Sequence, residues 1–105
     1  MTDDTDAFRP LQFEDFANRI GDSFAIAEQG FAGLSLTLTE AEPLRAAWTR
    51  PGQRPPFSLV FVGRHQQVLE QRLYSFDLAR IGKVDIFLVP IGRDANGVSY
   101  QAVFN

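Results

Sequence analysis

His65 is the residue whose type most directly suggests chemistry, because an imidazole can bind a metal or move a proton near neutral pH. It is the only histidine of the chain and follows Arg64 in a predicted turn over 64–67. A metal site built from several histidines is therefore excluded, and the Gly-x-Ser-x-Gly turn of a serine nucleophile is absent. One hypothesis stays open, in which Arg64, His65 and Arg72 converge on a small anion or metabolite at the mouth of a barrel, for binding or for catalysis. The alternative is that His65 is a solvated turn residue.

The carboxylates form two pairs by spacing. Glu14 and Asp15 lie on the polar side of a predicted helix, and Glu40 and Glu42 lie two residues apart on one strand face. Paired carboxylates can carry out acid–base chemistry or hold a hard cation. Glu40 and Glu42, however, stand at a strand end just before Pro43, which is typical of a solvated exit. We therefore predict no catalytic residue and no metal site.

Three further absences narrow the function. The segment 93–97 resembles the start of a calcium loop but lacks the alternating oxygen ligands and the later glutamate, so a β-turn at its Asn-Gly pair is favoured. Gly30 and Gly33 are not followed by the Gly-Lys-Ser or Gly-Lys-Thr of a phosphate-binding loop. The chain has no cysteine, which excludes disulfides, thiolate metal sites and cysteine nucleophiles. We predict neither an enzyme nor a bound cofactor.

The segment 43–56 has the composition of a binding loop. It contains Arg45, Trp48, Arg50 and Arg54, and arginine and tryptophan are enriched at binding hot spots. Its four prolines would reduce the entropy lost on binding. The alternative is that Trp48 folds back to plug one end of the barrel while the arginines stay solvated. Single-stranded nucleic acid could stack on the same residues, but the net charge of −3 argues against it.

The totals indicate one domain of ordinary globular composition. A chain of 105 residues with 45% apolar and 22% charged side chains can bury a core without disulfides. The acidic, polar start lacks the basic and apolar regions of a secretory signal, and no apolar run reaches the roughly 20 residues that span a bilayer. We expect a frayed tail over 1–10, a single β domain over 11–105, synthesis in the cytoplasm and no membrane contact.

Hydrophobic periodicity predicts a mainly β fold, namely a small antiparallel six-stranded barrel or sandwich with one short N-terminal helix. The helix is expected over 11–21, where apolar residues recur at helical spacing before a glycine. Turn signals at short intervals bound six apolar or alternating runs, without intervening helices, which favours antiparallel pairing. The predicted strands are 22–28, 33–42, 57–63, 68–78, 83–92 and 98–104.

The last predicted strand runs almost to the end of the chain. Such a strand is often the edge of a sheet, and an edge can pair with another chain. We therefore expect an edge at 98–104, through which the protein could form a homo-oligomer. Tyr100 alternates with Val98, Ala102 and Phe104, so its ring is expected in the core or in an interface.

Five motifs spread over the chain resemble those of one family. They are a Pro-Phe-Ser-Leu-hydrophobic-Phe strand at Pro56 to Phe61, Gln-x-x-Tyr at Gln71 to Tyr74, Phe-Leu-Val-Pro at Phe87 to Pro90, Tyr-x-Ala-Val-Phe-Asn at Tyr100 to Asn105, and a Phe, short helix, Gly-x-x-Phe opening within 13–26. With them the chain resembles a family of small bacterial proteins catalogued as domain of unknown function 6916. The resemblance is specific in the C-terminal half and loose over 43–56.

The resemblance implies no activity and no catalytic residue, because the matching positions are hydrophobic strand residues. Members of the family resemble companions of phage-tail-collar-like proteins, which implies an assembly, adaptor or chaperone role and a later association with a tail-like fibre or particle. The expected function is accordingly a non-enzymatic protein–protein interaction module, with a tail-collar-like fibre protein as one candidate partner. Residues Arg45, Trp48, Arg50 and Arg54 are the predicted contacts. The anion or metabolite site and weak binding of single-stranded nucleic acid are the alternatives.

Overall fold

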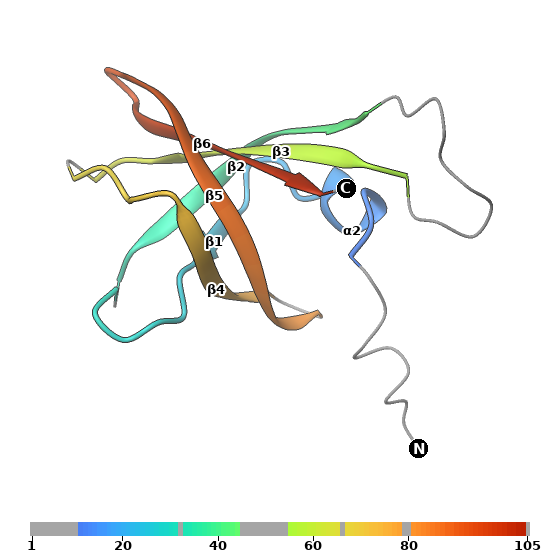
Figure 1. Ribbon diagram of the computed structural model, residues 1–105, viewed down its shortest axis with the longest axis horizontal. Coiled ribbons are helices and arrows are strands. Elements are labelled where there is room, and N and C mark those ends of the chain that lie inside the picture. Colours follow the sequence, from blue (N-terminus) through green and yellow to red (C-terminus); the bar gives the residue numbers. More distant parts are fainter. Residues whose placement is uncertain (1–10, 32, 45–54, 66, 79–80, 105) are drawn as a thin grey trace.

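The six strands form one antiparallel sheet that curls into a nearly closed barrel, as the computed structural model shows (Figure 1). The structure describes residues 11–31, 33–44, 55–65, 67–78 and 81–104. The elements are α2 (Glu14–Ala17), β1 (Ser23–Ala25), β2 (Ser35–Pro43), β3 (Phe57–Gly63), β4 (Arg72–Leu78), β5 (Gly82–Asp94) and β6 (Gly97–Phe104). The predicted fold class is confirmed.

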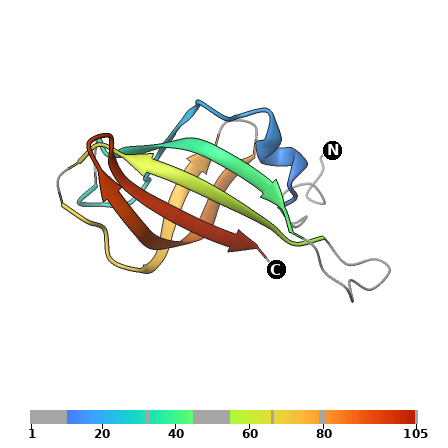
Figure 2. The ribbon, with the colours of Figure 1, turned by 90° about the horizontal axis from the view of Figure 1, so that it is seen from above.

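Strand order in the sheet is β1-β2-β3-β6-β5-β4, and every neighbouring pair is antiparallel. Among the described strands, the order of the chain is left only between β3 and β4. The connection, called here the crossover 64–71, lies across one end of the barrel and is described except for residue 66. Strand β5 pairs with β4 through its first half and with β6 through its second half. Figure 2 shows the consequence: β2, β3 and β6 run together along one side, with β4 and the start of β5 behind them.

The prediction that the last strand is an edge is wrong. Strand β6 lies in the middle of the sheet, with β3 on one side and β5 on the other. The end strands are instead β1 and β4, which are joined by a single bridge between Ile26 and Phe76. A chain terminus does not determine pairing order, because the crossover 64–71 sends β4 to the far side before β5 and β6 fold back.

Aromatic rings fill the barrel at the end that α2 covers. Phe16 is fully buried and packs against Phe57 and Phe104, whose rings are stacked with centroids 4.6 Å apart. The helix itself is one turn, shorter than the predicted 11–21, and Asn18 follows it as its C-cap. Ile20, which lies within the predicted helix, is 53% exposed, because the helix has ended before this position.

The predicted binding loop lies largely outside the described residues. Arg45, Trp48, Arg50 and Arg54 all fall in the segment 45–54, so the structure places none of these four side chains. Within the described part of the chain, no helix is long and apolar enough to cross a membrane.

Candidate functional site

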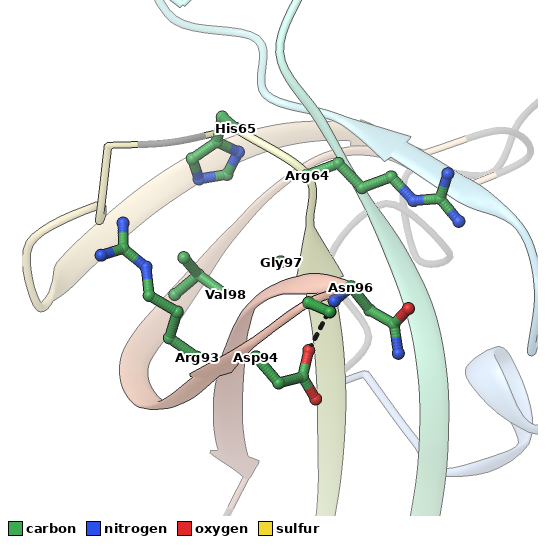
Figure 3. A pocket seen from close by; sticks show the side chains of 8 residues that line it. Arg64, His65, Arg93, Asp94, Asn96, Gly97 and Val98 are labelled. Atoms are coloured by element: carbon green, nitrogen blue, oxygen red, sulfur yellow. Dashed lines mark hydrogen bonds between the residues drawn. The ribbon is translucent and has the colours of Figure 1, made fainter.

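Two hollows open at the barrel end crossed by residues 64–71, and His65 lines both of them. Figure 3 shows the residues that line the larger one. The larger, of about 730 Å³, lies between Arg64 and His65 on one side and the β5–β6 turn, residues 93–98, on the other. The smaller, of about 380 Å³, lies between residues 67–74 and the side chains of Phe31 and Leu34. Both fall in the size range of ligand pockets, which makes this end the first candidate site.

Tyr100 ties the crossover to the centre of the sheet. Its hydroxyl oxygen lies 3.0 Å from Nε2 of His65 and accepts a hydrogen bond of 2.9 Å from the backbone N–H of Leu69. The imidazole and the phenol ring are stacked, with centroids 6.0 Å apart and planes inclined by 24°. The side chain of Leu69, within the crossover, is buried. One side chain of β6 thus holds both ends of the segment that covers the barrel.

Two glycines allow this close packing. A Cβ atom on Gly63 would lie 2.2 Å from Cε1 of His65, and one on Gly97 would lie 2.1 Å from the carbonyl oxygen of Gly63. Gly97 also has a φ of +133°, a conformation that other residues rarely adopt. It is the glycine of the Asn-Gly turn predicted from the sequence, where Asp94 accepts a hydrogen bond of 2.8 Å from the N–H of Asn96 (Figure 3).

Burial controls the titration of His65 and Tyr100. Desolvation lowers the pKa of His65 from its ordinary value of 6.5, and Nδ1 is buried without a hydrogen-bond partner among the described residues. Burial also raises the pKa of Tyr100 above 10.0, so the hydroxyl stays protonated at neutral pH. Both side chains are therefore neutral at pH 7, and their nitrogen and oxygen atoms bond to each other rather than to a bound molecule.

The side chain of Arg72, which lines the smaller hollow, is fixed by contacts with Glu28 and Tyr74. Its Nη2 donates a hydrogen bond of 2.8 Å to Glu28 and its guanidinium lies over the ring of Tyr74, 4.0 Å from the centroid. The second carboxylate oxygen of Glu28 accepts the N–H of Ser75 at 2.7 Å. Hydrogen bonds from Arg72 and Ser75 lower the pKa of Glu28, and the bond to Glu28 raises the pKa of Arg72.

The three residues predicted to converge on an anion are placed apart. Arg64 lines the larger hollow and Arg72 the smaller, with His65 between them. In Figure 3 the side chain of Arg64 extends away from His65, while that of Arg93 reaches toward it. The guanidinium of Arg72 is directed at Glu28. Each hollow is thus lined by two of the three predicted residues, Arg64 with His65 at the larger and His65 with Arg72 at the smaller, and neither hollow is lined by all three.

Sequence reasoning missed the partners that give this end its geometry. Tyr100 was expected to be buried, which is confirmed, but its bond to His65 depends on the pairing of β3 with β6. Glu28 carried no signal, because its partners Arg72 and Ser75 lie more than forty positions away in the sequence. No group of three or more histidine, cysteine, aspartate or glutamate side chains could hold a metal ion within the described ranges.

A second candidate surface is the outer side of β3, β6 and the end of β5. Six of its side chains point away from the core by strand alternation and carry no charge, whereas Arg93 and Asp94, the last two residues of β5, are charged. We call it the outer β3–β6 face; it consists of Val60, Val62, Val89, Ser99, Gln101 and Val103. Val103 is 47% exposed, and Ile91 at the neighbouring β5 bulge is 51% exposed.

Two carboxylates border the outer β3–β6 face on one side. Glu40 and Glu42 of β2 are paired in register with Val60 and Ser58, so they point to the same side of the sheet, and both are exposed. The predicted spacing of these acids on one strand face is thus correct. The six residues of the face carry no charge. Glu40 and Glu42 form an acidic flank along one side of it.

The comparisons with known proteins give one match. No curated protein and no solved structure matches the chain significantly. The model of one protein family matches residues 11–104, which is almost all of the chain and includes every strand and α2. The chain therefore belongs to the family described as domain of unknown function (DUF6916).

Proposed function

We propose that the protein is a non-enzymatic protein–protein interaction module that binds its partner through the outer β3–β6 face. The observation that carries the proposal is that the apolar side chains of that face are partly exposed, Val103 most of all, with no charge among the six residues. Apolar surface buried on association stabilises a complex by roughly 25 cal/mol per Å², and charged residues are depleted from the centre of interfaces. The face has both properties.

The acidic flank supports one kind of occupant. Glu40 and Glu42 are exposed beside the face, so a partner gains most from them if it places lysine or arginine opposite. The partner that fits is a protein whose contact surface is apolar at its centre and basic along one border. From the family resemblance, we propose that the protein acts as an assembly, adaptor or chaperone component of a tail-like fibre or particle.

The experiment is a capture of partners from cells that make the protein, with two matched variants beside the wild type. Val103→Asp places a charge in the outer β3–β6 face, and Ile20→Asp places the same charge on an exposed apolar residue that follows α2. Each variant is first shown to be folded by its amide NMR spectrum. We expect a protein that binds wild type and Ile20→Asp, is lost from Val103→Asp and is released as salt concentration rises.

Other outcomes would overturn the proposal. A captured protein that Val103→Asp retains at full strength would place the binding surface elsewhere, with the segment 45–54 as the next region to change. A wild-type chain that elutes as a dimer and loses this behaviour in Val103→Asp would make a second copy the occupant of the face. Capture of nothing by wild type would contradict a stable partner.

A further inference from the structure

The ring of His65 is half-buried between the two hollows, but its Nδ1 atom is fully buried, which favours the neutral ring. Nε2 faces the hydroxyl of Tyr100 at 3.0 Å, and Nδ1 is buried against Gly63, where an added Cβ would lie only 2.7 Å away. A neutral imidazole needs a single N–H donor, and either tautomer satisfies the contact with Tyr100. An imidazolium carries a second N–H, and the described residues provide no acceptor for it at Nδ1.

The surrounding charges do not compensate for a second proton. Arg64 precedes His65 in the crossover, and Arg93 of β5 reaches toward the ring across the larger hollow (Figure 3). Asp94 also lines this hollow, and its carboxylate accepts the N–H of Asn96 at 2.8 Å. On the side of the smaller hollow, Glu70 is exposed and the charge of Arg72 is paired with Glu28. Beside Gly63 lies apolar Leu36 of β2, and from β6 the hydroxyl of Tyr100 stays protonated because burial raises its pKa.

The same hydroxyl holds the covering segment in place. Tyr100 accepts the backbone N–H of Leu69 while it contacts His65, so these two residues attach the crossover to β6 at one point. If the ring leaves to find water for its second N–H, the contact with Tyr100 is lost and the residues beside it lose their anchor.

We propose that His65 is an acid-sensitive latch of the crossover 64–71: uptake of one proton by its ring releases the segment around Leu69 from Tyr100 and opens this end of the barrel. The proton comes from solvent and no covalent bond changes. The inference is independent of the proposed binding function, because the outer β3–β6 face lies along the sheet and not at this end.

The sign of the pH dependence follows from linkage. Burial lowers the pKa of His65 in the closed form, and an open, solvated ring titrates near 6.5. The latch is therefore closed at full strength above about pH 6.5 and weakens as pH falls below it. Uptake of one proton changes the opening equilibrium at most about tenfold for each pH unit.

The test is residue-resolved amide hydrogen exchange by NMR between pH 7.5 and 5, corrected for the intrinsic pH dependence of exchange. We expect the protection of the Leu69 amide to fall by up to about tenfold per pH unit below about 6.5, while that of Ala27, bonded to Ser75 at 2.8 Å, stays constant. In His65→Gln, which cannot titrate, the fall should disappear. Constant protection of Leu69, or the same fall in His65→Gln, would overturn the proposal.

If His65→Gln does not fold, the titration of His65 in the wild-type chain tests the proposal instead. His65 is the only histidine, so its ring signals in the wild-type chain can be followed without ambiguity. They should titrate at lower pH than in the urea-unfolded chain, with the same midpoint as the loss of Leu69 protection. A ring that titrates at the unfolded value, with Leu69 still protected, would contradict a latch.

Discussion

Two lines of strand contact, called seams here, hold the barrel together and are built in different ways. Between β3 and β6, seven residue pairs form a continuous antiparallel ladder from Phe57–Phe104 to Gly63–Val98. Between β1 and β4, one bridge joins Ile26 to Phe76, and the N–H of Ser75 bonds to the side chain of Glu28. At the β1–β4 seam, the carboxylate of Glu28 accepts an N–H that a backbone carbonyl would accept in a continuous ladder. Two end strands with few backbone pairs can therefore still be joined.

The two seams suit different roles. The outer β3–β6 face lies on the continuous ladder, where fixed backbone positions hold its side chains in a constant arrangement for a partner. The β1–β4 seam depends on Glu28 and Arg72, which are partly exposed and whose attraction is screened by solvent. Local opening is therefore expected at the β1–β4 seam before it occurs at the ladder.

The largest effect is expected at the core residue that serves both seams. Phe61 of β3 is fully buried, with ring centroids 5.5 Å from Phe24 of β1 and 6.1 Å from Phe76 of β4. Phe61→Ala leaves a cavity between the two sides and should lower the free energy of unfolding by about 3–5 kcal/mol. Urea denaturation of both proteins measures this loss. A change below about 1 kcal/mol would mean that the core is not packed as described.

The next effect concerns the turn that begins the ladder. Gly97 has a φ of +133°, and a Cβ there would lie 2.1 Å from the carbonyl oxygen of Gly63. Gly97→Ala should therefore destabilise the protein by about 2 kcal/mol or more, since backbone strain and a clash with β3 add together. Gly92→Ala is the control, because an added Cβ there meets no atom within 4 Å. Equal urea midpoints for the two variants would contradict the close approach.

The third prediction separates the seams by pH. Glu28→Gln removes the charge that Arg72 and Ser75 bind, so the amide of Ser75 should exchange faster while the amides of the β3–β6 ladder stay unchanged. The folded pKa of Glu28 lies below its ordinary value of 4.5, so its contribution is present above that pH and is lost as pH falls through the folded value. In the wild type, the protection of the Ser75 amide from hydrogen exchange should fall in acid. In Glu28→Gln, acid should cause no further fall. An acid response that persists in the variant would assign it to another group.

The smallest effect is expected on the outer side of β4 and β5. Leu73 and Phe87 are opposite each other in register and are 53% and 44% exposed. Phe87→Ser removes a cross-strand contact in water and should lower the free energy of unfolding by about 0.2–1 kcal/mol, far less than Phe61→Ala. A loss comparable to that of Phe61→Ala, measured in the same urea series, would show that this ring is packed into the core.

The sequence predicted the bounds of individual strands better than the order of the strands in the sheet. The bounds of β3, 57–63, agree with the structure, because prolines and a glycine enclose an apolar run. Alternation along a strand shows which side chains face inward, as at Tyr100, but it does not identify the strand alongside. The position of β6 and the pairing of Glu28 with Arg72 both arise from the crossover, which brings distant segments together without a local pattern. His65 was recognised as notable by its type, whereas its enclosure depends on Gly63, Gly97 and Tyr100.

The central claim is that the continuous ladder, and not the β1–β4 seam, carries the binding surface. The direct test is the affinity of a partner captured by wild type for two folded variants, Val103→Asp on the outer β3–β6 face and Glu28→Gln at the seam. We predict a loss of at least about tenfold for Val103→Asp, as for an interface residue worth more than 1.4 kcal/mol, and wild-type affinity for Glu28→Gln. Wild-type affinity of Val103→Asp, with weakened binding by Glu28→Gln, would contradict the account.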